Sequence, residues 1–108
     1  MNPGTVVIAD FLGAVRIKRR PALVISTSLY HAERPDVILT IITSQIVKSN
    51  AKTDYVLKDW RAAGLNQPSV MRVYLGMKTP AELTEIGQLS NRDWTEVQKR
   101  LQIALAFK

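Results

Sequence analysis

Cysteine is absent from this 108-residue sequence, and histidine occurs once, as His31. A chain without cysteine has no disulfide, no thiol nucleophile, no iron–sulfur cluster and no zinc–thiolate site. A single histidine also excludes a metal site built on several imidazoles. Any chemistry that this protein performs must therefore use His31 alone or other polar side chains.

Long apolar segments are also missing. No uninterrupted apolar run approaches the ~20 residues that a membrane-spanning helix needs. The apolar segment 5–15 is broken by Asp10 and follows no basic region, which is untypical of a signal peptide. We therefore expect a cytoplasmic bacterial protein that has no membrane segment.

Acidic residues are the scarcer charge. The sequence has 9 Asp and Glu against 15 Lys and Arg, so its net charge is +6 and its pI is about 10.0. A small protein with this excess is attracted to polyanions such as nucleic acids. The length fits a single domain over residues 1–108, and a hydrophobic fraction of 46% is that of a globular protein.

Most of the chain has the pattern of short strands. β-Branched and apolar runs bounded by Gly or Pro predict strands, and these runs lie at 5–11, 21–27, 36–45, 54–58 and 69–75. Pro21 is expected at the first position of its strand, where a missing N–H does least harm.

The C-terminal segment has a helical period instead. Trp94, Val97 and Leu101 recur at helical spacing, and Ser90 with Asp93 forms an N-cap pattern. These features predict an amphipathic helix over about 92–106, and a short helical turn is expected at 81–83 after Pro80. Five or more strands and one terminal helix indicate a mainly β fold, a small and strongly curved barrel with the helix packed on it.

A basic cluster stands between the first two predicted strands, where it is expected to form a loop. Arg16, Lys18, Arg19 and Arg20 supply its four cations. The cluster is suited to capturing phosphate, although a solvated basic loop would have the same composition. Arg20 is distinct because Pro21 follows it and restricts its backbone, so that its guanidinium can be aimed at one phosphate.

Polar residues also end the strand predicted at 36–45. Thr43, Ser44 and Gln45 follow its apolar run. The Thr43 and Ser44 hydroxyls are able to bond a phosphate or a 2′-hydroxyl, and equally to bond their own turn.

A third set lies on the strand predicted at 69–75. Arg72 and Tyr74 share a face of this strand, which begins at Ser69. The pair could clamp a nucleotide, or Tyr74 could lie in the core with its hydroxyl at the rim. We expect the loop residue His31 to be inert and Trp60 to cover the core rather than to stack on a base.

Two segments together resemble the MazF/PemK family of toxins from type II toxin–antitoxin systems. They are residues 18–26, KRRPALVIS, and residues 42–45, ITSQ. The opening strand from Gly4 and the segment 86–89, IGQL, fit the family as well. The resemblance extends from Gly4 to about Leu105.

This resemblance implies an SH3-like barrel of about five to seven strands with a C-terminal helix, and a homodimer. It also implies a metal-independent endoribonuclease, with no cofactor, that cuts single-stranded RNA at short sequence motifs and stops translation. Such toxins are blocked by a cognate antitoxin with an extended, acidic C-terminal segment, and the toxin–antitoxin complex is expected to bind operator DNA.

The family's functional residues carry over unevenly. Arg20 and Thr43 match its catalytic arginine and threonine, and Arg72 falls where some members have a second catalytic arginine. Tyr74 stands where several members have an acidic residue, which leaves the general base undefined. The remaining residues expected to contact RNA are Arg16, Lys18, Arg19, Ser44, Gln45, Ser69 and Tyr74.

Three alternatives stay open at this point. A CcdB-like gyrase inhibitor has a related fold, but the C-terminal residues 105–108, LAFK, lack the Trp-Gly-Ile ending on which that activity depends. A non-catalytic nucleic-acid-binding barrel would share the basic surface without needing Arg20 or Thr43. A toxin that has lost its activity is the third alternative, because of Tyr74.

Overall fold

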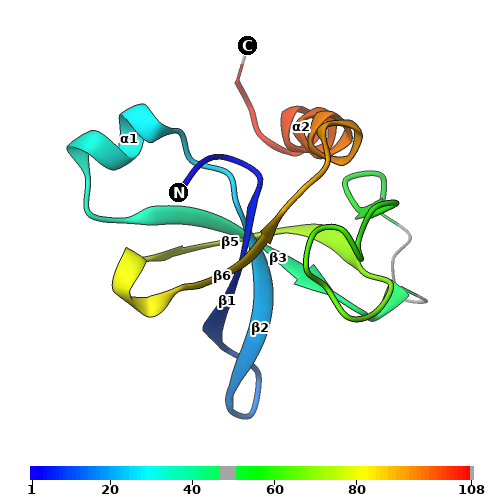
Figure 1. The fold of residues 1–108 in the computed structure, drawn as a ribbon, viewed down its shortest axis with the longest axis horizontal. Helices are drawn as coiled ribbons and strands as arrows, with labels where there is room; N and C mark the ends of the chain where they lie inside the picture. The colour runs from blue at the N-terminus through cyan, green and yellow to red at the C-terminus, as the bar shows by residue number, and fades with distance from the viewer. Residues whose placement is uncertain (47–50, 108) are drawn as a thin grey trace.

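The computed structural model describes residues 1–46 and 51–107. Their strands form one antiparallel sheet that curls into a half-barrel, in the order β4-β5-β3-β2-β1-β6 (Figure 1). The strands are β1 (Thr5–Leu12), β2 (Ile17–Val24), β3 (Val37–Thr43), β4 (Tyr55–Val56), β5 (Val70–Lys78) and β6 (Thr84–Gln88). This architecture confirms the predicted mainly β fold.

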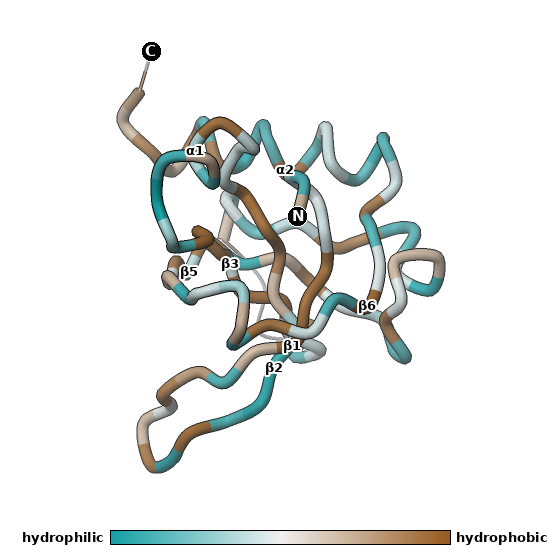
Figure 2. Tube along the Cα trace, turned by 60° about the vertical axis from the view of Figure 1, so that its left-hand side comes forward, coloured by the Kyte–Doolittle hydropathy of each residue, from teal (hydrophilic) through white to brown (hydrophobic). Residues whose placement is uncertain are grey.

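The helices lie toward one end of the half-barrel, and the β1–β2 hairpin projects from the opposite end (Figures 1 and 2). Helix α2 (Asn91–Ala104) is the predicted C-terminal helix, and the Ser90 side chain caps it by accepting a hydrogen bond from the Asp93 backbone N–H. A 3-10 turn, η2 (Pro80–Glu82), corresponds to the helical turn predicted after Pro80.

Apolar side chains pack on both faces of the central strands. Val6 and Leu23 belong to the cluster that Val97 and Leu101 of α2 complete, whereas their neighbour Val7 belongs to the opposite cluster. Successive residues of a strand point to opposite faces of the sheet. The nearly continuous apolar runs of the sequence follow from this burial on two sides.

Two elements were not predicted. Helix α1 (Ser28–Glu33) occupies a segment that the sequence indicated only as a connection, and Thr27 caps it by accepting from the Tyr30 backbone N–H. Strand β6 is short and largely exposed, so its residues lack a clear apolar pattern. It forms because it can pair with β1 across a long sequence separation.

The position of the basic cluster differs from the prediction. Lys18, Arg19 and Arg20 lie within β2 rather than in a loop, where they pair with residues of β1, and only Arg16 lies in the turn. Pro21 is accordingly in the middle of its strand. It is tolerated there because β2 pairs with β3 only from Ala22 onward, so that one side of β2 is an edge at this point.

Candidate functional site

The candidate site begins where β2 and β3 separate. Their last pair on this side is Ala22 with Ile41, and the next residue of β2 is Pro21, which has no N–H to extend the ladder. If the register continued, Arg20 would stand opposite Thr43. The strands diverge instead, and the space that they leave is open to solvent.

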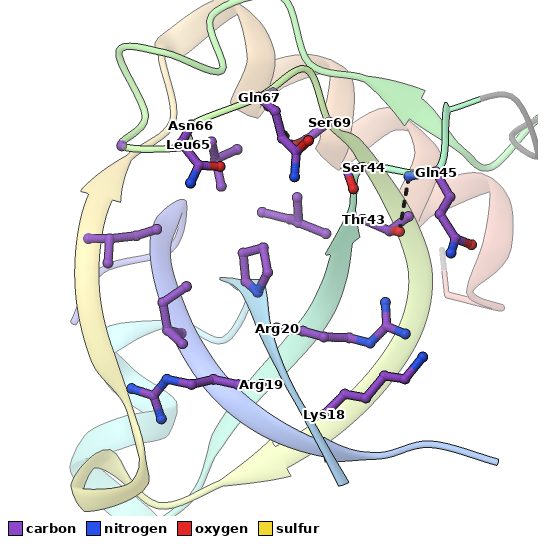
Figure 3. A pocket seen from close by; sticks show the side chains of 15 residues that line it. Lys18, Arg19, Arg20, Thr43, Ser44, Gln45, Leu65, Asn66, Gln67 and Ser69 are labelled. Carbon is purple, nitrogen blue, oxygen red and sulfur yellow. Dashed lines mark hydrogen bonds between the residues drawn. The ribbon is translucent and has the colours of Figure 1, made fainter. Parts of the chain in front are cut away.

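A pocket of about 550 Å³, which we call the first pocket, occupies this space (Figure 3). Cations from β2 form one side of it, polar residues after β3 form another, and a loop between β4 and β5 forms the third. Apolar side chains line the pocket between these three sides. The lining consists of Ile8, Lys18, Arg19, Arg20, Pro21, Ile42, Thr43, Ser44, Gln45, Gly64, Leu65, Asn66, Gln67, Ser69 and Ile86.

A second pocket of about 230 Å³ adjoins the first. Arg20, Thr43 and Gln45 line both pockets, and we call these three residues the shared wall. The rest of the second pocket comes from the β1–β2 hairpin and from β5. Its further lining residues are Phe11, Leu12, Gly13, Ala14, Ile41, Arg72 and Tyr74.

Positive charge dominates the two pockets. Their lining, as far as the structure describes it, contains four Lys and Arg residues and no Asp or Glu. Arg19 pairs with Asp10 at 3.8 Å, but both side chains are exposed, and such a pair adds little energy. Arg20 forms no ion pair with any described residue, so its charge is available to a ligand.

Arg72 is held more firmly than the other cations. Its Nε lies 3.9 Å from Oδ2 of Asp54, whose side chain is only 7% exposed. The backbone around it is fixed too, since the Thr40 hydroxyl donates to the Arg72 carbonyl and accepts from the Tyr74 N–H. Arg72 lines the second pocket but not the first, and the exposed Tyr74 ring stands beside it.

The hydroxyl groups of Thr43 and Ser69 line the first pocket, and each forms a hydrogen bond to the backbone of a residue two positions away. Thr43 is 7% exposed, and its Oγ1 accepts from the Gln45 N–H at 3.2 Å. The Ser69 hydroxyl donates to the Gln67 carbonyl at 2.9 Å. Both hydroxyl oxygens thus take part in a hydrogen bond within their own turn, which is one of the two uses that the sequence allows for Thr43. The hydroxyl hydrogen of Thr43 makes no hydrogen bond within the described chain and stays available as a donor.

A comparison with known proteins identifies the family of this chain. Residues 2–105 match the family model described as PemK-like, MazF-like toxin of type II toxin-antitoxin system. The chain belongs to this family. No curated protein sequence matches it.

Several solved structures share the fold. An endoribonuclease in complex with its cognate antitoxin, from a mycobacterial species, aligns with a TM-score of 0.80 at 17% identity, over 100% of this chain and 97% of that one. The toxin MazF-mt6 of Mycobacterium tuberculosis aligns with a TM-score of 0.75 at 21% identity, over 96% of this chain and 98% of that one. A chain of the MazE-MazF structure from Deinococcus radiodurans aligns with a TM-score of 0.74 at 19% identity, over 100% of this chain and 97% of that one. At these identities the likeness establishes the fold alone.

Three residues of this PemK/MazF-like chain that the sequence analysis considered lie outside the first and second pockets. Arg16 is exposed in the β1–β2 turn, where its carbonyl accepts from the Gly13 N–H. His31 on α1 shares a hydrogen bond with the Ser26 hydroxyl. Trp60 packs against the core, as expected, with the Arg61 guanidinium 4.9 Å from the centre of its ring.

Sequence reasoning missed the loop that forms the third side of the first pocket. Gly64, Asn66 and Gln67 all line this pocket, and none was a candidate. The available signal was a polar Asn66-Gln67 pair between Leu65 and Pro68. Nothing local in that pair indicates which part of the sheet it faces.

No described helix is long and apolar enough to span a membrane. Within residues 1–46 and 51–107, no group of three or more His, Cys, Asp or Glu side chains is placed to hold a metal ion.

Proposed function

We propose that this PemK/MazF-like toxin is an endoribonuclease that cuts single-stranded RNA, including mRNA, and thereby inhibits translation. The proposal rests on the shared wall of Arg20, Thr43 and Gln45 between two cationic pockets. A strand of RNA with one nucleoside in each pocket has its linking phosphate at this wall. The phosphate then meets the Arg20 guanidinium and the Thr43 hydroxyl.

The reaction is a transesterification within the RNA. The 2′-oxygen attacks the adjacent phosphorus and loses its proton, while the bond from phosphorus to the 5′-oxygen breaks. The products are a 2′,3′-cyclic phosphate and a 5′-hydroxyl, which takes up a proton. Because the nucleophile belongs to the substrate, the protein has to align it and to stabilise the charge on the phosphorane, which needs no metal ion.

Each polar side chain then has a defined role. Arg20 donates to the non-bridging phosphate oxygens, and the Thr43 hydroxyl orients the same phosphate. Arg72 supplies a second positive charge from the second pocket, and its role is electrostatic because a guanidinium keeps its proton. The proton acceptor is water or Tyr74, since His31 lines neither pocket.

The other polar residues around the two pockets bind the strand. Lys18 and Arg19 hold phosphates, and Tyr74 stacks on a base from the rim of the second pocket. Ser44, Gln45 and Ser69 contact the sugar and phosphate near the shared wall. Arg16 attracts the strand from the hairpin turn without lining a pocket.

Incubation of the purified protein with a long RNA in EDTA tests this function. We expect discrete fragments that carry 5′-hydroxyl ends, detected by their labelling with a polynucleotide kinase without prior phosphatase treatment. RNA that stays intact but is retained on a gel would instead identify a non-catalytic binding protein, and fragments that form only after a divalent metal is added would refute the metal-independent mechanism.

We further propose that a cognate antitoxin blocks the same pockets with an extended, acidic segment. Carboxylates of such a segment would replace phosphates against Lys18, Arg19 and Arg20. The fold is shared with toxins whose structures include an antitoxin, such as MazE-MazF, which supports this partner.

The toxin is expected to be a homodimer, and its complex with the antitoxin is expected to bind operator DNA. Competition between the antitoxin and an uncleavable RNA tests the shared site, and light scattering tests the dimer.

A further inference from the structure

We propose that the loop over residues 64–67 reads the base held in the first pocket, and that the side-chain amides of Asn66 and Gln67 determine which base is accepted. This inference rests on the proposed RNA cleavage and extends it to sequence specificity. It assigns the first pocket to one nucleoside on one side of the scissile phosphate.

The two amides lie across the pocket from the cations. Figure 3 shows Asn66 and Gln67 extending into the hollow from the loop, while Arg19, Arg20 and Lys18 extend from β2 on the other side. Contacts to phosphate hold a nucleic acid without reading its sequence, whereas contacts to base edges read it. The first pocket therefore places phosphate binding on its β2 side and base reading on its loop side.

The chemistry of this loop suits a nucleobase. A carboxamide offers two N–H donors and a carbonyl acceptor, so it can match the paired donors and acceptors of a base edge. Apolar side chains from three elements, Ile8, Leu65 and Ile86, also line the pocket and offer surface for the base to lie on. The volume of about 550 Å³ is within the range of ligand pockets, roughly 300–1,000 Å³.

The backbone of the loop is fixed against β6 by two glycines. A Cβ on Gly64 would lie 2.2 Å from the Ile86 carbonyl oxygen, and a Cβ on Gly87 would lie 2.1 Å from the Ala63 carbonyl oxygen. Gly64 also has a φ of +89°, which other residues rarely adopt. Only glycine at both positions lets the loop approach β6 this closely.

The longer connection between β4 and β5 that carries this loop is also fastened to the rest of the fold at both of its ends. At its start, the buried Asp93 carboxylate accepts from the Lys58 and Asp59 N–H groups at 3.1 and 2.8 Å. At its end, the Leu57 N–H donates to the Ser69 carbonyl at 3.0 Å. A loop held at both ends and at its middle presents its amides in a preformed geometry, which lowers the entropic cost of binding and sharpens discrimination.

Sequencing of cut sites in a randomised RNA pool tests the inference. We compare the wild type with Asn66→Ala, Gln67→Ala and Asn66→Asp, which exchanges a donor for an acceptor at nearly constant shape. Because both residues are exposed, these variants should fold, and their thermal unfolding checks this. Gln98→Ala, at an exposed position of α2 outside the pockets, is the matched control.

We expect each amide variant to change the base preference at one position of the cut site by about tenfold, and Gln98→Ala to leave it unchanged. Cleavage with the same preference in all three amide variants would overturn the inference while the proposed function stands. If the wild type does not cut RNA at all, the proposed function is refuted and the inference with it.

Discussion

At the scale of single residues, the proposed chemistry depends most on Arg20. We expect Arg20→Ala to slow cleavage by on the order of 10²-fold or more, because the phosphorane loses its main charge partner. The thermal unfolding temperature should stay close to that of the wild type, since Arg20 forms no ion pair with the described residues. Single-turnover cleavage of a short RNA measures the effect.

The control is Arg34→Ala, at an exposed position outside both pockets, which should cut at the wild-type rate. Equal rates for the two variants would refute the role of Arg20.

The hydroxyl of Thr43 has a separate prediction. Thr43→Val keeps the shape of the side chain but removes both the phosphate donor and the acceptor of the Gln45 N–H. We expect cleavage to fall by on the order of tenfold or more. Thr43→Ser retains the hydroxyl and should restore most of the rate in the same assay. A serine variant as slow as the valine variant would show that the methyl group matters rather than the hydroxyl.

At the scale of elements, an ion pair links α2 to the loop after β4. Arg92 donates to both carboxylate oxygens of Asp59 at 2.7 Å, and these bonds, with one from Ser90, lower the pKa of Asp59 from 3.8 to about 2. Since the pKa is lower in the folded state, the stabilisation is complete above pH 4 and is lost as the pH falls to about 2.

Chemical unfolding between pH 2 and pH 5 tests this linkage. Asp59→Asn should remove part of the decline in stability that the wild type shows over this interval. Glu33→Gln, which alters an exposed carboxyl group on α1, should leave the decline as it is. A wild type and an Asp59→Asn variant with parallel pH profiles would contradict the assignment.

The close approach of the 64–67 loop to β6 gives a second prediction for an element. In Gly87→Ala the new methyl group meets the Ala63 carbonyl, which belongs to the backbone and cannot rotate away. We expect a loss of roughly 1–3 kcal/mol in the free energy of unfolding, measured in urea. Because the loop must move, the cut-site preference should also relax although Asn66 and Gln67 are unchanged. A stable variant with wild-type preference would show that the contact does not position the loop.

At the scale of the whole molecule, the excess of positive charge is gathered at the pockets. Lys18, Arg19, Arg20 and Arg72 line them without an acidic residue among the described lining. Each phosphate that a single strand presents to such cations adds about −0.7 to the slope of log binding constant against log salt. Four contacts would therefore give a slope of about −3.

Fluorescence anisotropy with an RNA that has no 2′-hydroxyl at the cut site measures this slope without cleavage. Lys18→Ala should make it shallower by about 0.7, whereas Lys99→Ala, on the exposed surface of α2, should not change it. The same slope for Lys18→Ala and the wild type would place the RNA elsewhere on the surface.

Local patterns were sufficient for much of this molecule. The alternation of residues such as Val6 and Val7 between two apolar clusters requires strands that are covered on both faces. The Ser90 cap and the helical period of Val97 and Leu101 specify α2. Both signals depend on residues that are close in sequence. The same holds for the resemblance to the family, which rests on the continuous segments 18–26 and 42–45.

Other features depend on contacts between distant segments, and only the tertiary structure decided them. The sequence does not show that β2 pairs with β1 through its basic residues, so the cations were expected in a loop. Nor does it show that β2 and β3 part after Ala22 and Ile41, which creates the first pocket. The loop with Asn66 and Gln67 reaches that pocket because Gly64 and Gly87 allow two backbones to meet. Charge, strand pattern and helix are local properties of the sequence, whereas the pocket is produced by the places where its strands stop pairing.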